Sequence, residues 1–337
     1  MSQRVTVRRN RPPAWRVRRA GPFCFLLLGA ACTSSPEGLS PAAASYLRAP
    51  FGVPRPSFFH AALLVPELQP AATQQAGTLL TEVGSYHADA KSTRTFEGVT
   101  SSFAGAYHEW IAAELHWGAL PRVELSFRTA VAGWDEVLDH FTLRDAGGNL
   151  IVRDEERLKE GEASQRHENV ARVDLGAKFQ LLGGDDATAT TAIAGGLKLP
   201  VARPGDLTSS GTYDVAATLL ETVRLGAWTL HANGGGVWPL GGQTLFHADE
   251  GIKLDPFAQG ALGANLQVDP LMALDLQLQA NTSAFRDVPF LKQGPITAVF
   301  GARRWFGPTS VEVAVGHGFD HESSDVWEAF FTFAWIF

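Results

Sequence analysis

A hydrophobic period of two runs through the chain from Gly77 to the last residue. Apolar and polar residues alternate, which predicts strands rather than helices. About twelve such runs follow one another, at 77–88, 107–117, 122–132, 169–181, 187–200, 211–225, 228–239, 253–268, 271–283, 294–305, 309–318 and 326–337. Runs of about ten to fifteen residues suit tilted strands that cross a bilayer.

The run 122–132 shows what such a strand requires. Val123, Leu125 and Phe127 lie on one face, and Glu124 and Arg128 lie on the other. The first face needs a non-aqueous neighbour and the second needs water. A strand between lipid and a polar interior meets both needs.

The last run has one face made almost wholly of aromatic and small residues, namely Trp327, Ala329, Phe331, Phe333, Trp335 and Phe337. At the edge of a soluble sheet such a strand would template aggregation. In an outer-membrane barrel the final strand faces lipid and pairs with the first strand. The end of the chain therefore favours a closed membrane barrel over a soluble sandwich.

The predicted connections alternate in length. Short turns are expected at 118–121, 183–186, 226–227, 269–270 and 306–308, and longer loops at 89–106, 133–168, 201–210, 240–252, 284–293 and 319–325. Outer-membrane barrels have short periplasmic turns and long outer loops. With an even number of strands, both termini are expected on the periplasmic side. Within the longest loop, helical spacing of apolar residues over 134–141 predicts a short amphipathic helix.

The amino terminus predicts export. The first twenty residues contain seven arginines and no acid, and a short apolar core at 22–31 precedes Cys32. This pattern is typical of a signal peptide, here 1–31. The apolar core is too short to span a bilayer, so a membrane protein of this sequence must be a β-barrel. The residues before Cys32 resemble a lipoprotein processing site, and both lipidation of Cys32 and ordinary cleavage remain open.

Residues 32–76 are rich in Ala, Pro and Ser and have no sustained period, so we expect a poorly structured periplasmic lead-in. The predicted organisation is a signal peptide at 1–31, this lead-in at 32–76, and an all-β, single transmembrane antiparallel barrel of about twelve strands at 77–337.

Charge and cysteine content exclude other classes of protein. The chain has 28 basic and 35 acidic residues, and all seven leader arginines would be lost with the signal peptide. A mature chain this acidic argues against a nucleic-acid partner. Cys24 lies in the leader, which leaves no pair for an internal disulfide. No metal or nucleotide motif is present, so no metal and no cofactor is expected.

Three segments resemble a bacterial outer-membrane β-barrel family of unknown function. They are GGLKLP at 195–200, GTYDV at 211–215 and LGAWTLHAN at 225–233. More distantly, the chain is similar to barrel transporters of the phenol meta-pathway. The resemblance implies an outer-membrane barrel in a Gram-negative bacterium, surrounded by outer-membrane lipids, whose Phe337 is read by the barrel-assembly machinery. It implies no established substrate, and Val201-Ala202 departs from the Thr-Gly usual in the family.

Parity along the strands predicts which residues face the lumen. The candidates for a pore lining are Glu114, Glu124, Arg128, Arg172, Asp174, Lys178, Lys198, Asp214, Arg224, His231, Asp275 and Gln277. These charges could line a porin-like passage for small solutes. They could instead pair across the lumen and plug it, which would leave a structural or interaction barrel, since twelve strands lie between filled and open barrels.

An outer-membrane hydrolase is the third alternative. Its sequence support is confined to His321 and Ser323 in a polar loop. We therefore expect a channel or transporter and not an enzyme.

Overall fold

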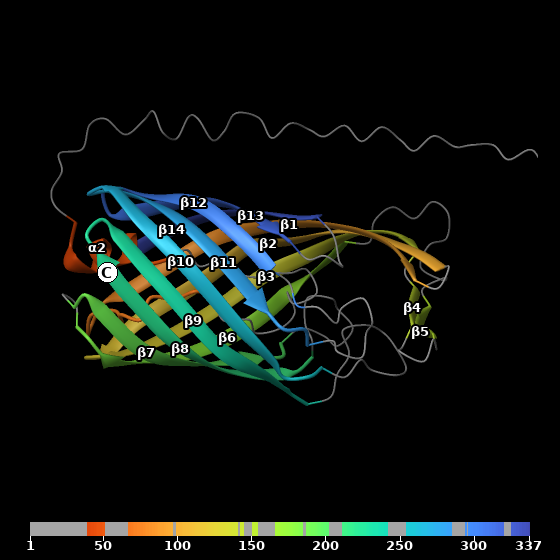
Figure 1. The fold of residues 1–337 in the computed structure, drawn as a ribbon, viewed down its shortest axis with the longest axis horizontal. Helices are drawn as coiled ribbons and strands as arrows, with labels where there is room; N and C mark the ends of the chain where they lie inside the picture. Colours follow the sequence, from red (N-terminus) through yellow and green to blue (C-terminus); the bar gives the residue numbers. More distant parts are fainter. Residues whose placement is uncertain are drawn as a thin grey trace, which may run out of the picture. The chain divides into compact units, whose positions relative to one another are not determined.

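The computed structural model describes residues 39–50, 67–96, 99–140, 142–144, 150–153, 166–184, 187–201, 211–241, 254–284, 294, 296–319 and 325–337. In this part of the chain twelve antiparallel strands form a closed barrel (Figure 1). The predicted fold class and strand number are therefore confirmed.

Each barrel strand pairs with its neighbours in the chain. The strands are β1 (Leu79–Phe96), β2 (Val99–Leu120), β3 (Val123–His140), β6 (Arg166–Leu182), β7 (Ala189–Leu199), β8 (Tyr213–Leu225), β9 (Trp228–Leu240), β10 (Phe257–Asp269), β11 (Met272–Asn281), β12 (Ile296–Phe306), β13 (Thr309–Gly318) and β14 (Asp325–Ile336). The barrel closes between β1 and β14, where the Leu79 amide donates to the Phe337 carbonyl at 3.0 Å. The last strand thus pairs with the first, as its sequence predicts.

Burial follows the predicted alternation. In β8 every second residue from Asp214 to Thr222 is buried, and the residues between them are more exposed. The outward side chains are largely apolar, and Leu125, Leu219 and Phe300 are each more than 40% exposed. An apolar outer surface of this extent requires a non-aqueous environment, as lipid supplies to a barrel.

Exposed aromatic residues lie at both ends of the strands. Trp117, Phe179 and Trp228 are exposed near the rim with the short turns, which we call the short-turn rim. Trp238 and Trp327 are exposed near the opposite, long-loop rim. Amphipathic rings favour the headgroup region, so these positions fit the two predicted aromatic girdles.

Two predicted loops are wrong in the described residues. The segment expected as a loop at 89–106 continues β1 and β2, which pair as far as Phe96 and Val99. The segment expected as a helix at 134–141 continues β3 to His140, and a small sheet of β4 (Thr142–Arg144) and β5 (Leu150–Arg153) follows. The extended β2 offers backbone partners to β3, and this pairing overrides the helical spacing of the apolar residues.

The lead-in also differs from its expectation. Within 32–76, the described residues 39–50 and 67–76 are ordered against the inner wall of the barrel, and we call them the N-terminal segment. It contains the helix α2 (Pro41–Leu47), capped by Ser40, whose side chain accepts from the Ala43 amide at 3.2 Å. Ser at the cap and Pro in the first turn favour this helix start.

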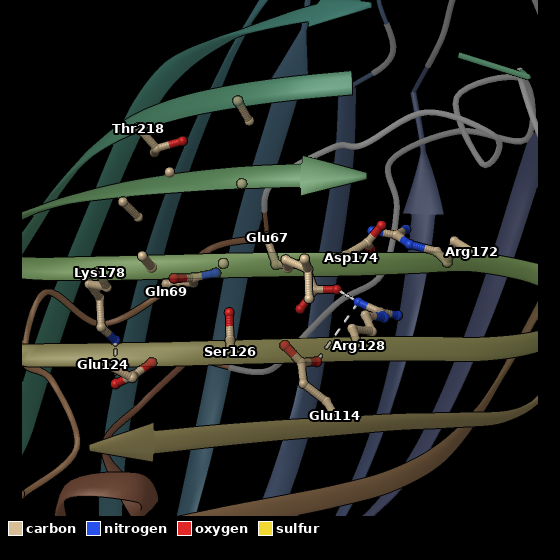
Figure 2. A pocket seen from close by; sticks show the side chains of 17 residues that line it. Glu67, Gln69, Glu114, Glu124, Ser126, Arg128, Arg172, Asp174, Lys178 and Thr218 are labelled. Carbon is tan, nitrogen blue, oxygen red and sulfur yellow. Dashed lines mark ion pairs between the residues drawn. The ribbon is translucent and has the colours of Figure 1, made fainter. Parts of the chain in front are cut away.

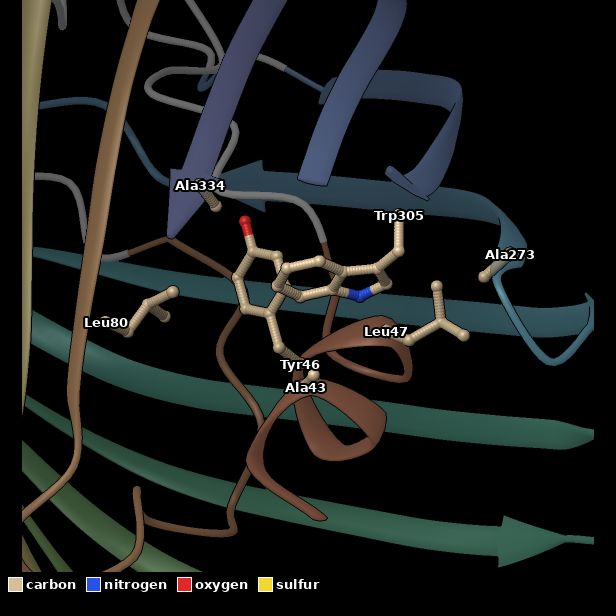
Figure 3. Packing of buried hydrophobic residues seen from close by; sticks show 7 residues of the cluster. All are labelled: Ala43, Tyr46, Leu47, Leu80, Ala273, Trp305 and Ala334. Atoms are coloured by element: carbon tan, nitrogen blue, oxygen red, sulfur yellow. The ribbon is translucent and has the colours of Figure 1, made fainter. Parts of the chain in front are cut away.

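A small apolar cluster seats α2 at the short-turn rim. Tyr46 and Leu47 pack against Trp305, Leu80 and Ala334 (Figure 3). The Tyr46 and Trp305 rings meet edge to face at 5.9 Å. The helix is short and isolated in sequence, so its stability comes from this packing rather than from propensity.

The signal peptide and Cys32 lie outside the described residues, and both stay predictions. Among the described residues, no helix is long and apolar enough to span a membrane.

Candidate functional site

The residues predicted to line the lumen lie on the inner wall of the barrel. Most of them are buried, namely Glu124, Arg128, Arg172, Asp174, Lys178, Lys198, Asp214, His231, Asp275 and Gln277. Glu114 and Arg224 are half-buried. Their role in a pore stays a prediction. The alternation of residues along each strand was the signal that these side chains face the lumen.

Strand register arranges several of these residues into one continuous row. Six side chains on adjacent strands lie directly opposite one another, in the order Glu82, Glu114, Arg128, Asp174, Lys198 and Asp214. We call them the charged row. Facing residues of this kind are about 5 Å apart at Cβ. From Glu114 onward the charge alternates in sign.

The charged row runs obliquely along the lumen. Glu82 is near the start of β1 at the short-turn rim, and Asp214 is near the start of β8 at the long-loop rim. Because barrel strands tilt, a line of facing residues climbs the wall. The row therefore connects the two ends of the barrel across β1, β2, β3, β6, β7 and β8.

Ion pairs hold the row together. Lys198 Nζ lies 2.8 Å from an Asp214 carboxylate oxygen, and Arg172 pairs with Asp174. Arg128 lies 3.9 Å from Glu114 and also pairs with Glu67 of the N-terminal segment (Figure 2). The row is thus a network rather than a set of independent charges.

A second charged group lies beside the row, closer to the short-turn rim. Glu124 accepts from Lys178 Nζ and contacts His116 Nδ1, each at 3.0 Å. The Gln74 amide of the N-terminal segment donates to Glu124 at 2.8 Å. This carboxylate therefore joins three strands to the segment.

The two parts of the N-terminal segment contact different walls. Residues 67–76 bond to the wall that carries the charged row, whereas residues 39–50 are held to the opposite wall, where Arg303 on β12 is the principal anchor. The buried Arg303 guanidinium donates to the backbone carbonyls of Tyr46, Ala49 (2.8 Å) and Pro50 (3.3 Å). It also pairs with Glu312 on β13. A single buried cation thus donates to three backbone carbonyls at the end of α2, of which that of Tyr46 also accepts from the Ala49 amide at 3.0 Å.

Tyr46 completes this anchor. Its hydroxyl donates to Glu312, and Arg303 lies over its ring at 4.1 Å from the centroid. Burial, followed by the charge of Glu312, raises the pKa of Tyr46 well above its usual value. The hydroxyl therefore remains a proton donor to Glu312.

Further contacts of the segment come from polar side chains of β8 to β11. His231 Nε2 lies 3.0 Å from the Arg48 carbonyl, and Asn265 donates to the Leu47 carbonyl at 3.3 Å. Of the predicted lumen residues on this wall, His231 contacts the segment directly. Asp275 and Gln277 instead bond to other side chains of the wall: Asp275 accepts from Asn265 at 3.5 Å, and Gln277 accepts from Gln279 at 3.2 Å.

Two cavities remain between the segment and the wall that carries the charged row. The larger is lined by Glu67, Arg128, Arg172, Asp174 and Lys178, among others, and offers about 80 Å³ to the centres of water-sized molecules (Figure 2). The smaller, of about 50 Å³, extends past Glu82 and His116 toward Tyr46. The two share Glu67, Gln69, Glu114, Glu124 and Lys178 in their walls.

Sequence reasoning missed the partners that complete this site. Glu67 and Tyr46 lie in a segment without periodicity, and Arg303 lies in a run whose residues are apolar on both faces. The adjacent basic pair Arg303-Arg304 at a strand end was the available signal for a lumenal cation. His321 and Ser323 lie outside the described residues, and those residues contain no group of metal-ligating side chains.

No protein-family model and no curated protein matches the sequence. Among solved structures, the chain is similar to an outer membrane channel from Pseudomonas putida F1, with a TM-score of 0.57 and 12% identity over 79% of this chain and 97% of that one. The chain is more distantly similar to the toluene transporter TodX of P. putida, with a TM-score of 0.40 and 8% identity over 77% of this chain and 88% of that one. It is also distantly similar to the translocator domain of the autotransporter NalP from Neisseria meningitidis, with a TM-score of 0.40 and 11% identity over 77% of this chain and 88% of that one. The fold is that of outer-membrane β-barrels, in agreement with the family resemblance noted in the sequence.

Proposed function

We propose that the chain is an outer-membrane channel that passes small polar solutes along the wall formed by β2, β3, β6 and β7. The observation that carries the proposal is the pair of cavities between the N-terminal segment and the charged row. Arg303 holds residues 39–50 of the segment to the opposite wall, and the cavities lie beside the contacts that Glu67 and Gln74 make with this wall.

Alternating charges suit a passage for polar solutes. Ion selectivity in channels depends on the charged side chains that line the narrowest part. The charged row offers a sequence of acceptors and donors from one rim to the other, from Glu82 to Asp214. The outer-membrane channels among the structural neighbours support this function by analogy of fold.

We further propose that the short-turn rim, both termini and the N-terminal segment are periplasmic, in the orientation usual for outer-membrane barrels. Heat-modifiable gel migration of an outer-membrane fraction tests the membrane location of the barrel. The unheated protein should migrate faster than the boiled protein, because a closed barrel resists detergent. Recovery of the protein wholly in the soluble fraction would contradict this assignment.

Planar-bilayer recording of the purified protein tests transport directly. We expect discrete current steps smaller than those of open sixteen-stranded porins, because the N-terminal segment narrows the lumen. The absence of steps in any salt, with protein that still shows heat-modifiable migration, would refute the proposal.

That outcome would favour the second candidate, a plugged barrel with a structural or interaction role. The extensive anchoring of the segment by Arg303, Asn265 and His231 is the observation in its favour. The two candidates differ in whether the cavities join into a continuous path, which the current decides.

A further inference from the structure

The outer surface of the barrel carries an arginine near the short-turn rim. In β12 every second residue from Thr297 to Trp305 is buried, and Arg304 follows on the outward face, where it is half-buried. Its cross-strand neighbours are Met272 on β11 and Val311 on β13. A guanidinium is always charged, so this position places a permanent cation on an apolar surface that faces lipid.

The residues around Arg304 leave this cation without a counter-charge. Its guanidinium carbon lies 5.8 Å from the centre of the Phe306 ring, but it makes no hydrogen bond or ion pair with any residue that the structure describes. Its Nε is buried without a partner, whereas Nη1 and Nη2 remain accessible at the outer surface. A charge on the lipid face of a barrel is costly unless an opposite charge from outside the chain compensates it.

The depth of Arg304 matches that of lipid headgroups. It lies two residues before the end of β12, which corresponds to about 5 Å along the axis of a barrel with tilted strands. Trp117 and Trp228, which belong to the aromatic girdle of this rim, also lie within three residues of the ends of their strands. Long basic side chains in this zone extend toward the headgroups.

The free edge of the guanidinium defines the ligand. Nη1 and Nη2 together present parallel N–H donors, which match two oxygens of a phosphate. A phosphatidylethanolamine headgroup also carries an ammonium, for which the side chains of Met272, Val311 and Phe306 offer no acceptor. A phosphatidylglycerol headgroup carries a net negative charge and only neutral hydroxyls, so it suits an isolated cation better.

We infer that Arg304 and the apolar residues around it bind an anionic phospholipid of the periplasmic leaflet. The phosphate pairs with the guanidinium, and the acyl chains lie on Leu274, Ala302 and Val313, which continue the outward face toward the middle of the barrel. The site does not depend on transport. It rests on the proposed function only for the periplasmic position of the short-turn rim, which selects phospholipid as the lipid at this depth.

Native mass spectrometry of the detergent-purified protein tests the site by titration with dimyristoyl-phosphatidylglycerol. Dimyristoylglycerol, which lacks the phosphate, and dimyristoyl-phosphatidylethanolamine are the comparison lipids. We expect phosphatidylglycerol to bind about tenfold more tightly than dimyristoylglycerol, because charged hydrogen bonds to phosphate are strong. Phosphatidylethanolamine should bind with an affinity between the two.

Arg304→Gln should weaken phosphatidylglycerol binding by about tenfold, and Arg304→Lys, which keeps the charge but loses the fork, should give an intermediate loss. Arg122→Gln is the matched control. Arg122 belongs to the same rim, in the turn before β3, but it is exposed and donates to the Gly183 carbonyl at 3.3 Å. It should leave lipid binding unchanged.

Heat-modifiable migration verifies that each variant folds. If Arg304→Gln fails to fold, Arg304→Lys and the comparison of the three lipids decide. Equal binding of phosphatidylglycerol and either comparison lipid, or wild-type affinity in Arg304→Gln, would overturn the inference.

The inference and the proposed function fail separately. Phosphatidylglycerol binding by a protein that gives no bilayer current would keep the lipid site and refute the channel. Labelling of Ala227→Cys, in the turn between β8 and β9, by an impermeant maleimide added to intact cells would refute the periplasmic rim. That result would also refute the assignment of the lipid to the periplasmic leaflet, whatever the current.

Discussion

Replacing Arg303 with methionine is expected to increase the conductance of the barrel severalfold, because it releases the N-terminal segment from the lumen. The buried guanidinium is the shared donor to the carbonyls of Tyr46, Ala49 and Pro50. Removing one partner of a buried charged network costs roughly 3–5 kcal/mol. That loss shifts the equilibrium between docked and released segment by about two orders of magnitude or more.

Planar-bilayer recording measures the conductance, and trypsin cleavage after Arg48 reports release of the segment. Arg304→Met is the matched control, since Arg304 is the next residue of β12 and alternation places it on the other face. It should leave both readouts unchanged. An Arg303→Met protein with wild-type conductance and wild-type resistance to trypsin would show that the segment does not depend on this anchor.

Replacing Lys198 with methionine is expected to destabilise the barrel more than any exposed substitution. Lys198 and Asp214 pair at 2.8 Å, and their side chains are 2% and 0% exposed. Loss of the ammonium leaves the Asp214 carboxylate buried without this cation, at a cost of roughly 3–5 kcal/mol. Urea titration of the protein refolded in detergent, followed by tryptophan fluorescence, measures the loss.

The double variant Lys198→Met, Asp214→Leu should recover much of this stability, because it removes both charges together. Lys178→Met offers a comparison within the second charged group, where Glu124 keeps His116 and the Gln74 amide as partners. We expect its cost to be smaller. A single Lys198→Met variant as stable as the wild type would contradict the importance of the pair.

The alternation of apolar and polar residues was enough to predict which side chains face the lumen. It was not enough to predict which of them lie opposite one another on neighbouring strands. Alternation alone places Glu114, Arg128 and Asp174 on inward faces, since each strand has one clearly apolar side. Their position side by side depends on the register of three strands, which turn geometry and the β-bulges in β2 and β6 determine. A shift by two residues would keep every face and break the row.

The N-terminal segment could not be predicted for a different reason. Its residues 39–50 carry no period beyond one short helix, and their partners are far away in sequence. Arg303 is 254 residues from Ala49. Local propensity holds no information on such contacts, whereas the twelve strands follow from local alternation. The extension of β3 to His140 was missed because its partner, the extended β2, was itself expected as a loop.

The anchor of α2 has a consequence for how the barrel assembles. Closure requires β1 to meet β14, and closing a flexible loop of that length costs about 5 kcal/mol beyond a constant term in chain entropy. The N-terminal segment directly precedes β1, and its α2 end binds β12 and β13, of which β13 pairs with β14. If α2 docks on Arg303 and Glu312 before closure, the two ends of the sheet are held near each other, and the entropy cost of the closure step itself is smaller. The same contacts that narrow the lumen of the folded barrel thus favour the pairing of β1 with β14 that closes it.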